Sequence, residues 1–149
     1  MNKAVYYKVM FISSGIYSIV AAILFGVLAH FQFFMDLLGI TSPKLADTNG
    51  AIIWMYCFLL LIGIYGFMFI LVGIDITKNH LVISSGMIAK ILFFIILLVF
   101  FILNACDWPV LILGGIDLIW TALFIEFYVN FKKLDHEDIV GAYPYKITE

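Results

Sequence analysis

The sequence has no arginine and few charged residues of any kind. Charged residues occupy 12% of the 149 positions, and the formal net charge is −2. A soluble domain averages about 25% charged and about 45–50% apolar residues, whereas 65% of this chain is hydrophobic. Without a basic patch, the chain lacks the electrostatic footprint of a nucleic-acid-binding protein. A soluble fold could not bury so much apolar surface, so the composition predicts a protein embedded in membrane lipid.

Cysteine and histidine are also scarce, which excludes the common disulfide and metal scaffolds. The two cysteines, Cys57 and Cys106, form no Cys-x-x-Cys motif and have no metal-type spacing. The three histidines, His30, His80 and His136, never share one apolar run, so no two of them could ligate a haem within the membrane. We therefore expect no metal centre and no haem in this protein.

Long apolar runs are what the sequence has in abundance. A transmembrane helix needs about 20 mostly apolar residues, and four segments meet this requirement: about Val9–Ala29, Ala51–Ile74, Leu81–Leu103 and Pro109–Phe131. The first run is longer than a signal-peptide core and lacks a convincing cleavage site, so we expect it to remain as a span. The sequence predicts a single transmembrane domain over residues 1–149, an all-α four-helix bundle with up-down-up-down topology.

The lysines predict the orientation of these spans. Six lysines fall on one side of a four-span topology and only Lys44 falls on the other; the six are Lys3, Lys8, Lys78, Lys132, Lys133 and Lys146. Lysine-rich loops stay in the cytoplasm. We therefore expect both termini in the cytoplasm and the chain in the inner (cytoplasmic) membrane. Cys57 and Cys106 would both lie toward the outer side, where a disulfide is geometrically feasible but not favoured.

Two segments outside the spans have patterns of their own. In "HFQFFMDLLGI", residues 30–40, apolar side chains fall on one helical face: Phe31, Phe34, Leu37 and Leu38. This pattern favours a short helix lying on the membrane surface, although the first span could instead continue, tilted, for a turn or two. The tail, residues 132–149, mixes charges with tyrosines and is expected to be solvated or interfacial.

Small residues provide each span with a face on which another helix can pack. In lipid, helices associate through close backbone contact and hydrogen bonds rather than through apolar burial. The first span carries a small residue at every fourth position: Ser14, Ser18, Ala22 and Gly26. The second and third spans offer Gly63, Gly66 and Gly86. We expect these residues to pack helices together.

Three ionisable residues lie inside the spans: Lys90, Asp117 and Glu126. A lysine near the middle of a span costs roughly 2.5–3.5 kcal/mol on insertion scales, and such residues usually face the bundle interior and pair. At about 1.5 Å per residue, Lys90 lies roughly 12 Å above the inner boundary, Glu126 roughly 6 Å and Asp117 roughly 18–20 Å. The lysine therefore lies at a height between the two acids.

Asp117 and Glu126 project from opposite faces of the fourth span, so Lys90 can face only one of them. The tilt of side chains toward the N-terminus of their helix brings Lys90 and Glu126 together. Against this, Glu126 is close enough to the interface to reach water, whereas Asp117 is not, and pairing Lys90 with Asp117 lowers the total desolvation cost. We favour Asp117. The alternatives are a neutral Asp117 and a Lys90 that snorkels to the headgroups.

Further polar side chains lie at similar depth and could complete a pocket around Lys90. Tyr17 and Ser18 on the first span and Tyr65 on the second would form its lower part. Trp120 and Thr121 share a face with Asp117 and would form its upper part. The alternative is that the tyrosines only pack.

The last two-thirds of the chain carry a set of motifs: a Gly-x-Tyr-Gly helix, an acid and a histidine in the loop, a Gly-x-x-x-Lys start to the third span, and an Asp-x-Ile-Trp motif in the fourth. Their residues are Gly63, Tyr65, Gly66, Asp75, His80, Gly86, Lys90, Asp117, Ile119 and Trp120. In these motifs the chain resembles DoxX-like small bacterial membrane proteins. The resemblance implies a four-span architecture, strengthens the pairing of Lys90 with Asp117, and hints at a redox-linked role with a quinone.

Three functional hypotheses fit the sequence. The first is a non-enzymatic accessory subunit or scaffold that contacts other membrane proteins, or a second copy of itself, through its helices. The second is a redox-linked module that holds a quinone or other lipid beside Lys90 and Asp117. The third is a small proton-linked carrier in which Asp117 or Glu126 titrates during transport. No nucleophile–base, metal or phosphate-binding constellation points to an enzyme, so a non-enzymatic role is favoured.

Overall fold

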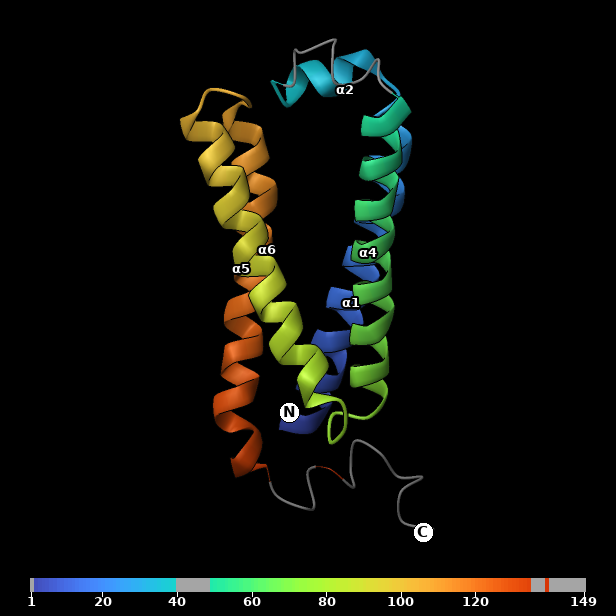
Figure 1. Cartoon of the computed structure of the whole chain (residues 1–149). Helices are drawn as coiled ribbons and strands as arrows, with labels where there is room; N and C mark the ends of the chain where they lie inside the picture. Colours follow the sequence, from blue (N-terminus) through green and yellow to red (C-terminus); the bar gives the residue numbers. More distant parts are fainter. Residues whose placement is uncertain (1, 40–48, 135–138, 140–149) are drawn as a thin grey trace.

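The structure, a computed structural model of the chain, describes residues 2–39, 49–134 and 139 (Figure 1). The elements in this part are α1 Lys3–Leu28, α2 Gln32–Leu37, α4 Asn49–Ile74, α5 His80–Ile102, α6 Trp108–Asn130 and the 3-10 helix η1 Phe131–Lys133. No strand occurs among these residues. The predicted all-α architecture is confirmed.

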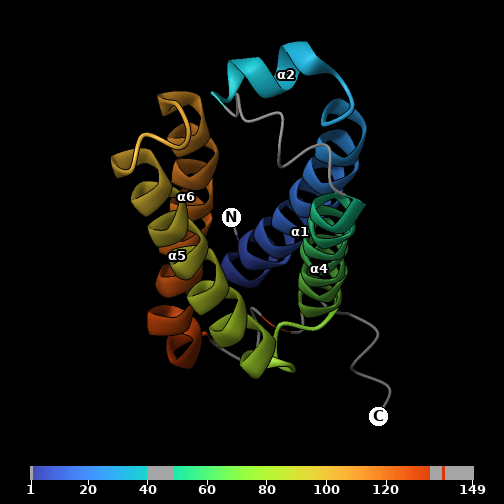
Figure 2. The same cartoon turned by 45° about the horizontal axis from the view of Figure 1, so that its top comes forward.

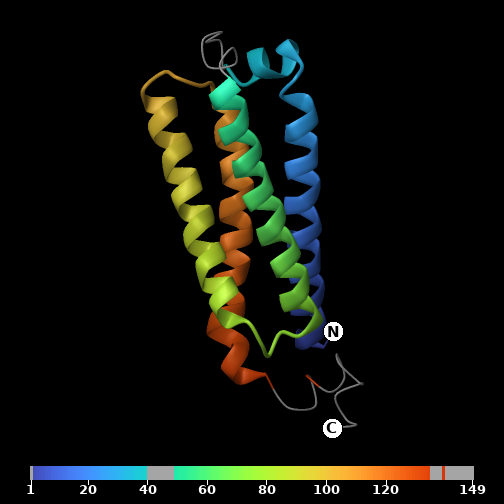
Figure 3. The same ribbon diagram turned by 45° about the vertical axis from the view of Figure 1, so that its right-hand side comes forward.

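Four of these helices are long and apolar enough to cross a membrane: α1, α4, α5 and α6. A helix of 23 residues, the length of α5, is about 35 Å long at about 1.5 Å per residue, which exceeds the roughly 30 Å hydrocarbon core of a bilayer. The four helices run alternately up and down, as Figure 3 shows. The protein is a small multi-pass membrane protein.

The helix ends agree with the predicted spans to within about two residues, except at the start of α1. This helix begins at Lys3 rather than near Val9. The reason is a cap, because the Asn2 side chain accepts hydrogen bonds from the backbone N–H of Ala4 at 2.8 Å and of Val5 at 3.3 Å. Asparagine is among the best residues for this role, so the helix begins directly after it, at Lys3.

The four spans form two pairs, α1 with α4 and α5 with α6. The pairs converge at the end of the bundle that carries residues 3 and 130, which we call the terminal end. They diverge toward the opposite end, the α2 end (Figures 1 and 2). Within the first pair the backbones approach closely, since a Cβ added to Gly66 would lie 2.7 Å from the carbonyl oxygen of Gly15. Such contact between small residues is the usual means of joining helices in lipid.

The aromatic core lies toward the terminal end, where the pairs meet. Its fully or almost fully buried rings come from three helices: Tyr7, Phe11, Phe69, Phe124 and Phe127. The ring centroids of Phe11 and Phe124 are 5.0 Å apart, and those of Phe69 and Phe124 are 4.9 Å apart. Spacings of about 4.5–7 Å are those of stabilising aromatic pairs. This half of the bundle is therefore closely packed.

The short helix expected after the first span is present as α2. It crosses the α2 end of the bundle from α1 toward α6 (Figure 2). Leu38 at its C-terminal end is buried and the Phe34 ring packs on that of Phe25 at 5.4 Å, whereas Phe31 and Leu37 are exposed. The apolar residues of this segment therefore divide between the helix ends beneath α2 and the outer surface of the protein.

The C-terminal end of α2 is fixed to the start of α6. The backbone N–H of Asp107 donates to the carbonyl oxygen of Leu38 at 3.0 Å. Gly39 has φ +68°, and a Cβ there would lie 2.7 Å from the Asp107 nitrogen. Only glycine adopts this backbone conformation readily and fits this space. This contact between the end of α2 and the start of α6, which we call the α2–α6 bridge, joins the two helix pairs where they are farthest apart.

The predicted tail, residues 132–149, lies mostly outside the described residues. Its first part forms the end of η1, and Leu134 and Ile139 pack against the aromatic core. Lys44, His136 and Lys146 also lie outside the described residues.

The reactivity of Cys106 tests the α2–α6 bridge. Both cysteines are free thiols, and Cys106 is buried in the turn before α6, packed with Leu38. Burial, and then the nearby Asp107 carboxylate, raise the pKa of the Cys106 thiol. Because the thiolate is the reactive form, we expect Cys106 to be alkylated slowly at neutral pH. Its alkylation rate should increase only at a pH higher than the pH at which an exposed cysteine becomes reactive. Labelling followed by mass spectrometry at a series of pH values, in a Cys57→Ser background, measures this.

The same assay tests the role of Gly39. A valine at this position cannot adopt the positive φ without strain and would overlap Asp107. We expect Gly39→Val to displace the end of α2 and to raise the alkylation rate of Cys106 several-fold. An unchanged rate would show that α2 does not protect this thiol.

Candidate functional site

The intramembrane lysine and one of the two acids meet across the second helix pair. Lys90 on α5 donates a hydrogen bond to Asp117 Oδ1 on α6, and the two form an ion pair. Lys90 is only 9% exposed. Of the predicted partners the structure selects Asp117, and the Lys90 amine does not snorkel to the headgroups. Intramembrane charges in proteins usually pair in this way.

Glu126 is not part of this polar centre. Its side chain is exposed, and Oε1 accepts a 3.4 Å hydrogen bond from the Tyr7 hydroxyl near the terminal end. Asp117 and Glu126 are nine residues apart, about 2.5 helical turns, so they point in opposite directions. The prediction that Glu126 belongs to the centre is therefore wrong.

A chamber opens between the helix pairs, on the α2 side of the ion pair. Its volume is about 440 Å³, within the range of about 300–1,000 Å³ that is typical of small-molecule sites. All four spans and α2 contribute to its walls, which are mostly apolar and include Phe25, Phe34, Leu38, Phe58, Phe93 and Leu97. The chamber exists because the helix pairs diverge while α2 covers the gap between them.

The polar residues of the chamber gather at one end. The lining residue nearest the terminal end is Tyr65 on α4 and Asp117 on α6. On α1 the two nearest are Tyr17 and Ser18, and on α5 Lys90 comes after Gly86 and Ala89. The chamber is thus an apolar cavity with a polar end, as the sequence predicted for Tyr17, Ser18 and Tyr65.

This polar end retains spare hydrogen-bonding capacity. An ammonium group has three donors, and the hydrogen bond found for Lys90 within the described residues is the one to Asp117 Oδ1. In the same part of the chain, no side chain bonds to Asp117 Oδ2 or to the hydroxyls of Tyr17 and Tyr65. The Ser18 hydroxyl donates to the Ser14 carbonyl oxygen at 3.0 Å. A ligand could therefore find both donors and acceptors here.

Trp120 and Thr121 lie beside the polar end rather than in it. Neither lines the chamber. The Thr121 hydroxyl donates to the Asp117 carbonyl oxygen at 2.9 Å, and the Trp120 ring lies 6.1 Å from that of Tyr17. Their predicted place in the pocket is therefore wrong; they support Asp117 and Tyr17 from behind.

Aromatic rings close the chamber on its terminal side. Phe69 is directly beneath the ion pair, with its ring centroid 6.0 Å from Lys90 Nζ. A ring at this distance attracts a cation. Gly86 makes room for this ring, because a Cβ there would lie 2.8 Å from Phe69 Cε1. Sequence reasoning missed Phe69, since α4 is apolar on every side and its pattern singles out no ring.

The predicted packing residues fall into two groups. Ser14, Ser18 and Gly66 are buried between helices, and Gly15, which lies outside the predicted stripe, contacts Gly66. Gly63, by contrast, has no atom within 4 Å of an added Cβ. Its predicted role in packing the helices of this chain is wrong.

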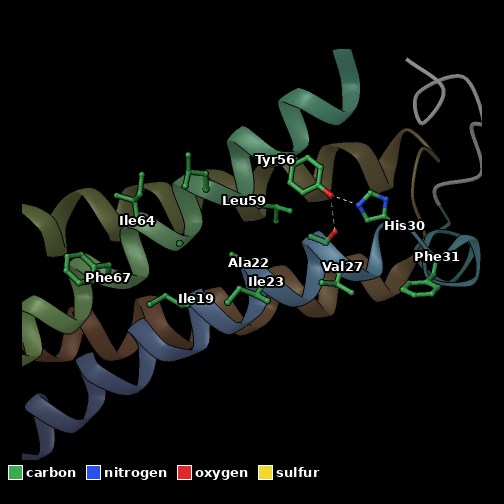
Figure 4. Close-up of a pocket in the computed structure, with 13 residues that line it drawn as sticks. Ile19, Ala22, Ile23, Val27, His30, Phe31, Tyr56, Leu59, Ile64 and Phe67 are labelled. Atoms are coloured by element: carbon green, nitrogen blue, oxygen red, sulfur yellow. Dashed lines mark hydrogen bonds between the residues drawn. The ribbon is translucent and has the colours of Figure 1, made fainter. Parts of the chain in front are cut away.

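Gly63 instead lines a second cavity, a groove on the outside of the α1–α4 pair (Figure 4). Its volume is about 940 Å³, and Ala22 and Gly26 also line it. At its α2 end, His30 and Tyr56 share a hydrogen bond, and the Tyr56 hydroxyl lies 3.4 Å from the Gly26 carbonyl oxygen. Apart from this pair its lining is apolar.

Comparisons with protein-family models, with curated proteins and with solved structures find no match to this chain. The resemblance to DoxX-like proteins therefore stays a prediction.

Proposed function

We propose that this membrane protein binds a lipid-soluble molecule, a lipid or a quinone, in the chamber between its helix pairs. The observation that carries the proposal is the Lys90–Asp117 ion pair at one end of an otherwise apolar cavity. A ligand with a polar head and an apolar body would satisfy both parts. Small-molecule sites have this composition, mostly apolar walls with a few convergent polar groups.

The energetics favour a functional reason for the pair. Burying two charges has a desolvation cost that their attraction often only offsets, and apolar residues of similar volume frequently stabilise a protein as well or better. Packing alone would be served by leucine at both positions. Holding a polar head inside the membrane requires hydrogen-bonding groups at that depth.

Filling the chamber should remove the ligand. Ala21 lines the chamber and the adjacent Ala22 lines the outer groove. We expect Ala21→Phe to lower the amount of lipid or quinone that copurifies in mild detergent by about tenfold, because the ring occupies the cavity. Ala22→Phe is the matched control and should retain the wild-type amount. Solvent extraction and mass spectrometry measure both; equal amounts in all three proteins, or none in the wild type, would contradict the proposal.

A role as an accessory subunit is the second candidate. It is favoured by the small residues that line the outer groove, Ala22, Gly26 and Gly63, because a Cβ added to Gly63 would have no atom within 4 Å. Small residues on a helix face admit a neighbouring helix in lipid. Isolation from native membranes in mild detergent tests this role. If the wild-type protein migrates as a lone monomer, and the Gly63→Leu variant migrates in the same way, this would count against the role.

A proton-linked carrier has less support. Proton transfer between the Lys90–Asp117 pair and the terminal end would have to pass Phe69, Phe11 and Phe124, which are fully or almost fully buried. Proteoliposomes that show pH-driven flux of a solute, lost in Asp117→Asn, would favour this role over the other two.

We also propose that the terminal end faces the cytoplasm of the inner membrane. The start of α1, the α4–α5 loop and the end of α6 lie at this end (Figure 1), and they carry or adjoin Lys3, Lys78 and Lys132, in accordance with the positive-inside rule. We expect a fluorescent protein fused to the N-terminus to be bright, and a periplasm-dependent phosphatase at the same place to be inactive. The reverse pattern would contradict this orientation.

A further inference from the structure

We propose that the ligand of the chamber is an amphiphile with an uncharged head that both donates and accepts hydrogen bonds. This inference rests on the proposed function and narrows it to one class of ligand. It excludes fatty acids, other anionic amphiphiles and long-chain amines as preferred ligands.

The charges on the chamber wall balance each other. Lys90 and Asp117 are the two charged residues among those that line it. Their charges are opposite and they are already paired, so the wall is electrically neutral. In a medium of low dielectric constant, one additional charge would stay unpaired at a high cost.

A ligand with a carboxylate head would incur this cost. To reach the ammonium of Lys90 it would have to displace Asp117, which would then be an unpaired anion within the membrane. An amine head would compete with Lys90 for Asp117 in the same way. A neutral head leaves the ion pair intact.

The groups left over at the polar end are those that a neutral head needs. Lys90 retains donors, Asp117 Oδ2 is an acceptor, and the hydroxyls of Tyr17 and Tyr65 can act as either; none of these is engaged by another side chain within the described residues. A hydroxyl head can accept from Lys90 and donate to Asp117 together. Ser18 is already engaged through its hydrogen bond to the Ser14 carbonyl oxygen.

The chamber also sets the shape of the body. Along α1 it extends from Tyr17 to Ala29, about 18 Å at about 1.5 Å per residue. Its volume of about 440 Å³ and the aromatic closure at Phe69 favour a single apolar chain over a two-chain phospholipid. The head would lie at the ion pair and the chain would extend toward α2.

The test uses three probes of equal chain length: dodecanol, dodecanoate and dodecylamine. Each is titrated into the wild-type protein in nanodiscs of neutral phospholipid, and bound adducts are counted by native mass spectrometry. The pH is one at which dodecanoate and dodecylamine are both charged. We expect dodecanol to bind about tenfold more tightly than either charged probe. Because this comparison needs no variant, it does not depend on whether a substitution folds.

A variant then tests the cause. In Asp117→Asn the chamber keeps only the charge of Lys90, so we expect dodecanoate to become the preferred probe, a reversal of about tenfold or more. Glu126→Gln is the matched control, because it removes a carboxylate from the same helix but outside the chamber, and should leave the wild-type preference unchanged.

The outcomes separate the two proposals. Binding of none of the probes to the wild type, with no copurifying lipid, would overturn the proposed function and this inference together. Tighter binding of dodecanoate or dodecylamine by the wild type would overturn this inference alone. So would a folded Asp117→Asn variant that still prefers dodecanol.

Discussion

Replacing Lys90 with methionine is expected to destabilise the protein by about 3–5 kcal/mol, the usual cost of removing one partner of a buried ion pair. The residual Asp117 would be an uncompensated carboxylate in the membrane. The double variant Lys90→Met with Asp117→Leu should recover most of this loss, because it removes both charges. Unfolding in mild detergent, followed by circular dichroism at neutral pH, measures all three proteins.

The control for this prediction is Glu126→Gln. Glu126 is exposed and accepts a 3.4 Å hydrogen bond from Tyr7, so we expect a change within about 1 kcal/mol. Additive losses in the double variant would contradict the account, because they would mean that Lys90 and Asp117 stabilise the bundle separately.

Replacing Gly66 with leucine is expected to lower the free energy of unfolding by a similar amount, about 3 kcal/mol or more. An added Cβ at this position would lie 2.7 Å from the Gly15 carbonyl oxygen and 3.0 Å from the Ser18 Cβ. Backbone cannot move aside as a flexible side chain can, so α1 and α4 must separate along their length. The same unfolding assay measures the effect.

The matched control lies one turn away on the same helix. Gly63→Leu introduces the same side chain in the same lipid environment, but nothing lies within 4 Å of its Cβ. We expect it to be neutral or slightly stabilising, since leucine has a better helix propensity than glycine. Equal losses in the two variants would show that the close crossing at Gly66 does not hold α1 and α4 together.

The sequence was informative where lipid makes a residue costly. Lys90 and Asp117 are conspicuous in apolar helices, and an argument from desolvation was sufficient to favour their pairing. The same argument left Glu126 as the alternative partner, because it lies close enough to the interface to reach water. The four spans followed from length and hydropathy alone.

The chamber could not be predicted in this way. Its walls are ordinary apolar residues such as Phe58, Phe93 and Leu97, on helices that are apolar on every side, so no periodicity shows which face is turned inward. Its existence depends on how far the helix pairs diverge and on where α2 lies. Both depend on tertiary contacts, among them the Asp107–Leu38 hydrogen bond.

The stripe of small residues shows a similar limit. The four-residue spacing from Ser14 to Gly26 predicted one continuous packing face, but a straight helix rotates such a stripe gradually around its axis. Its first half is therefore buried, while Ala22 and Gly26 line the outer groove. Gly15, outside the stripe, makes the close contact with Gly66.

The most direct test of the account is to locate a bound amphiphile by photo-crosslinking. A long-chain alcohol with a photoreactive group in its chain is added to the protein in nanodiscs, and the labelled residues are identified by peptide mass spectrometry. The account predicts labels on chamber residues such as Phe93, Leu97 and Leu113, which unlabelled dodecanol should displace and Ala21→Phe should abolish. Labels confined to the outer groove, at Ile23, Leu60 and Phe67, would contradict it.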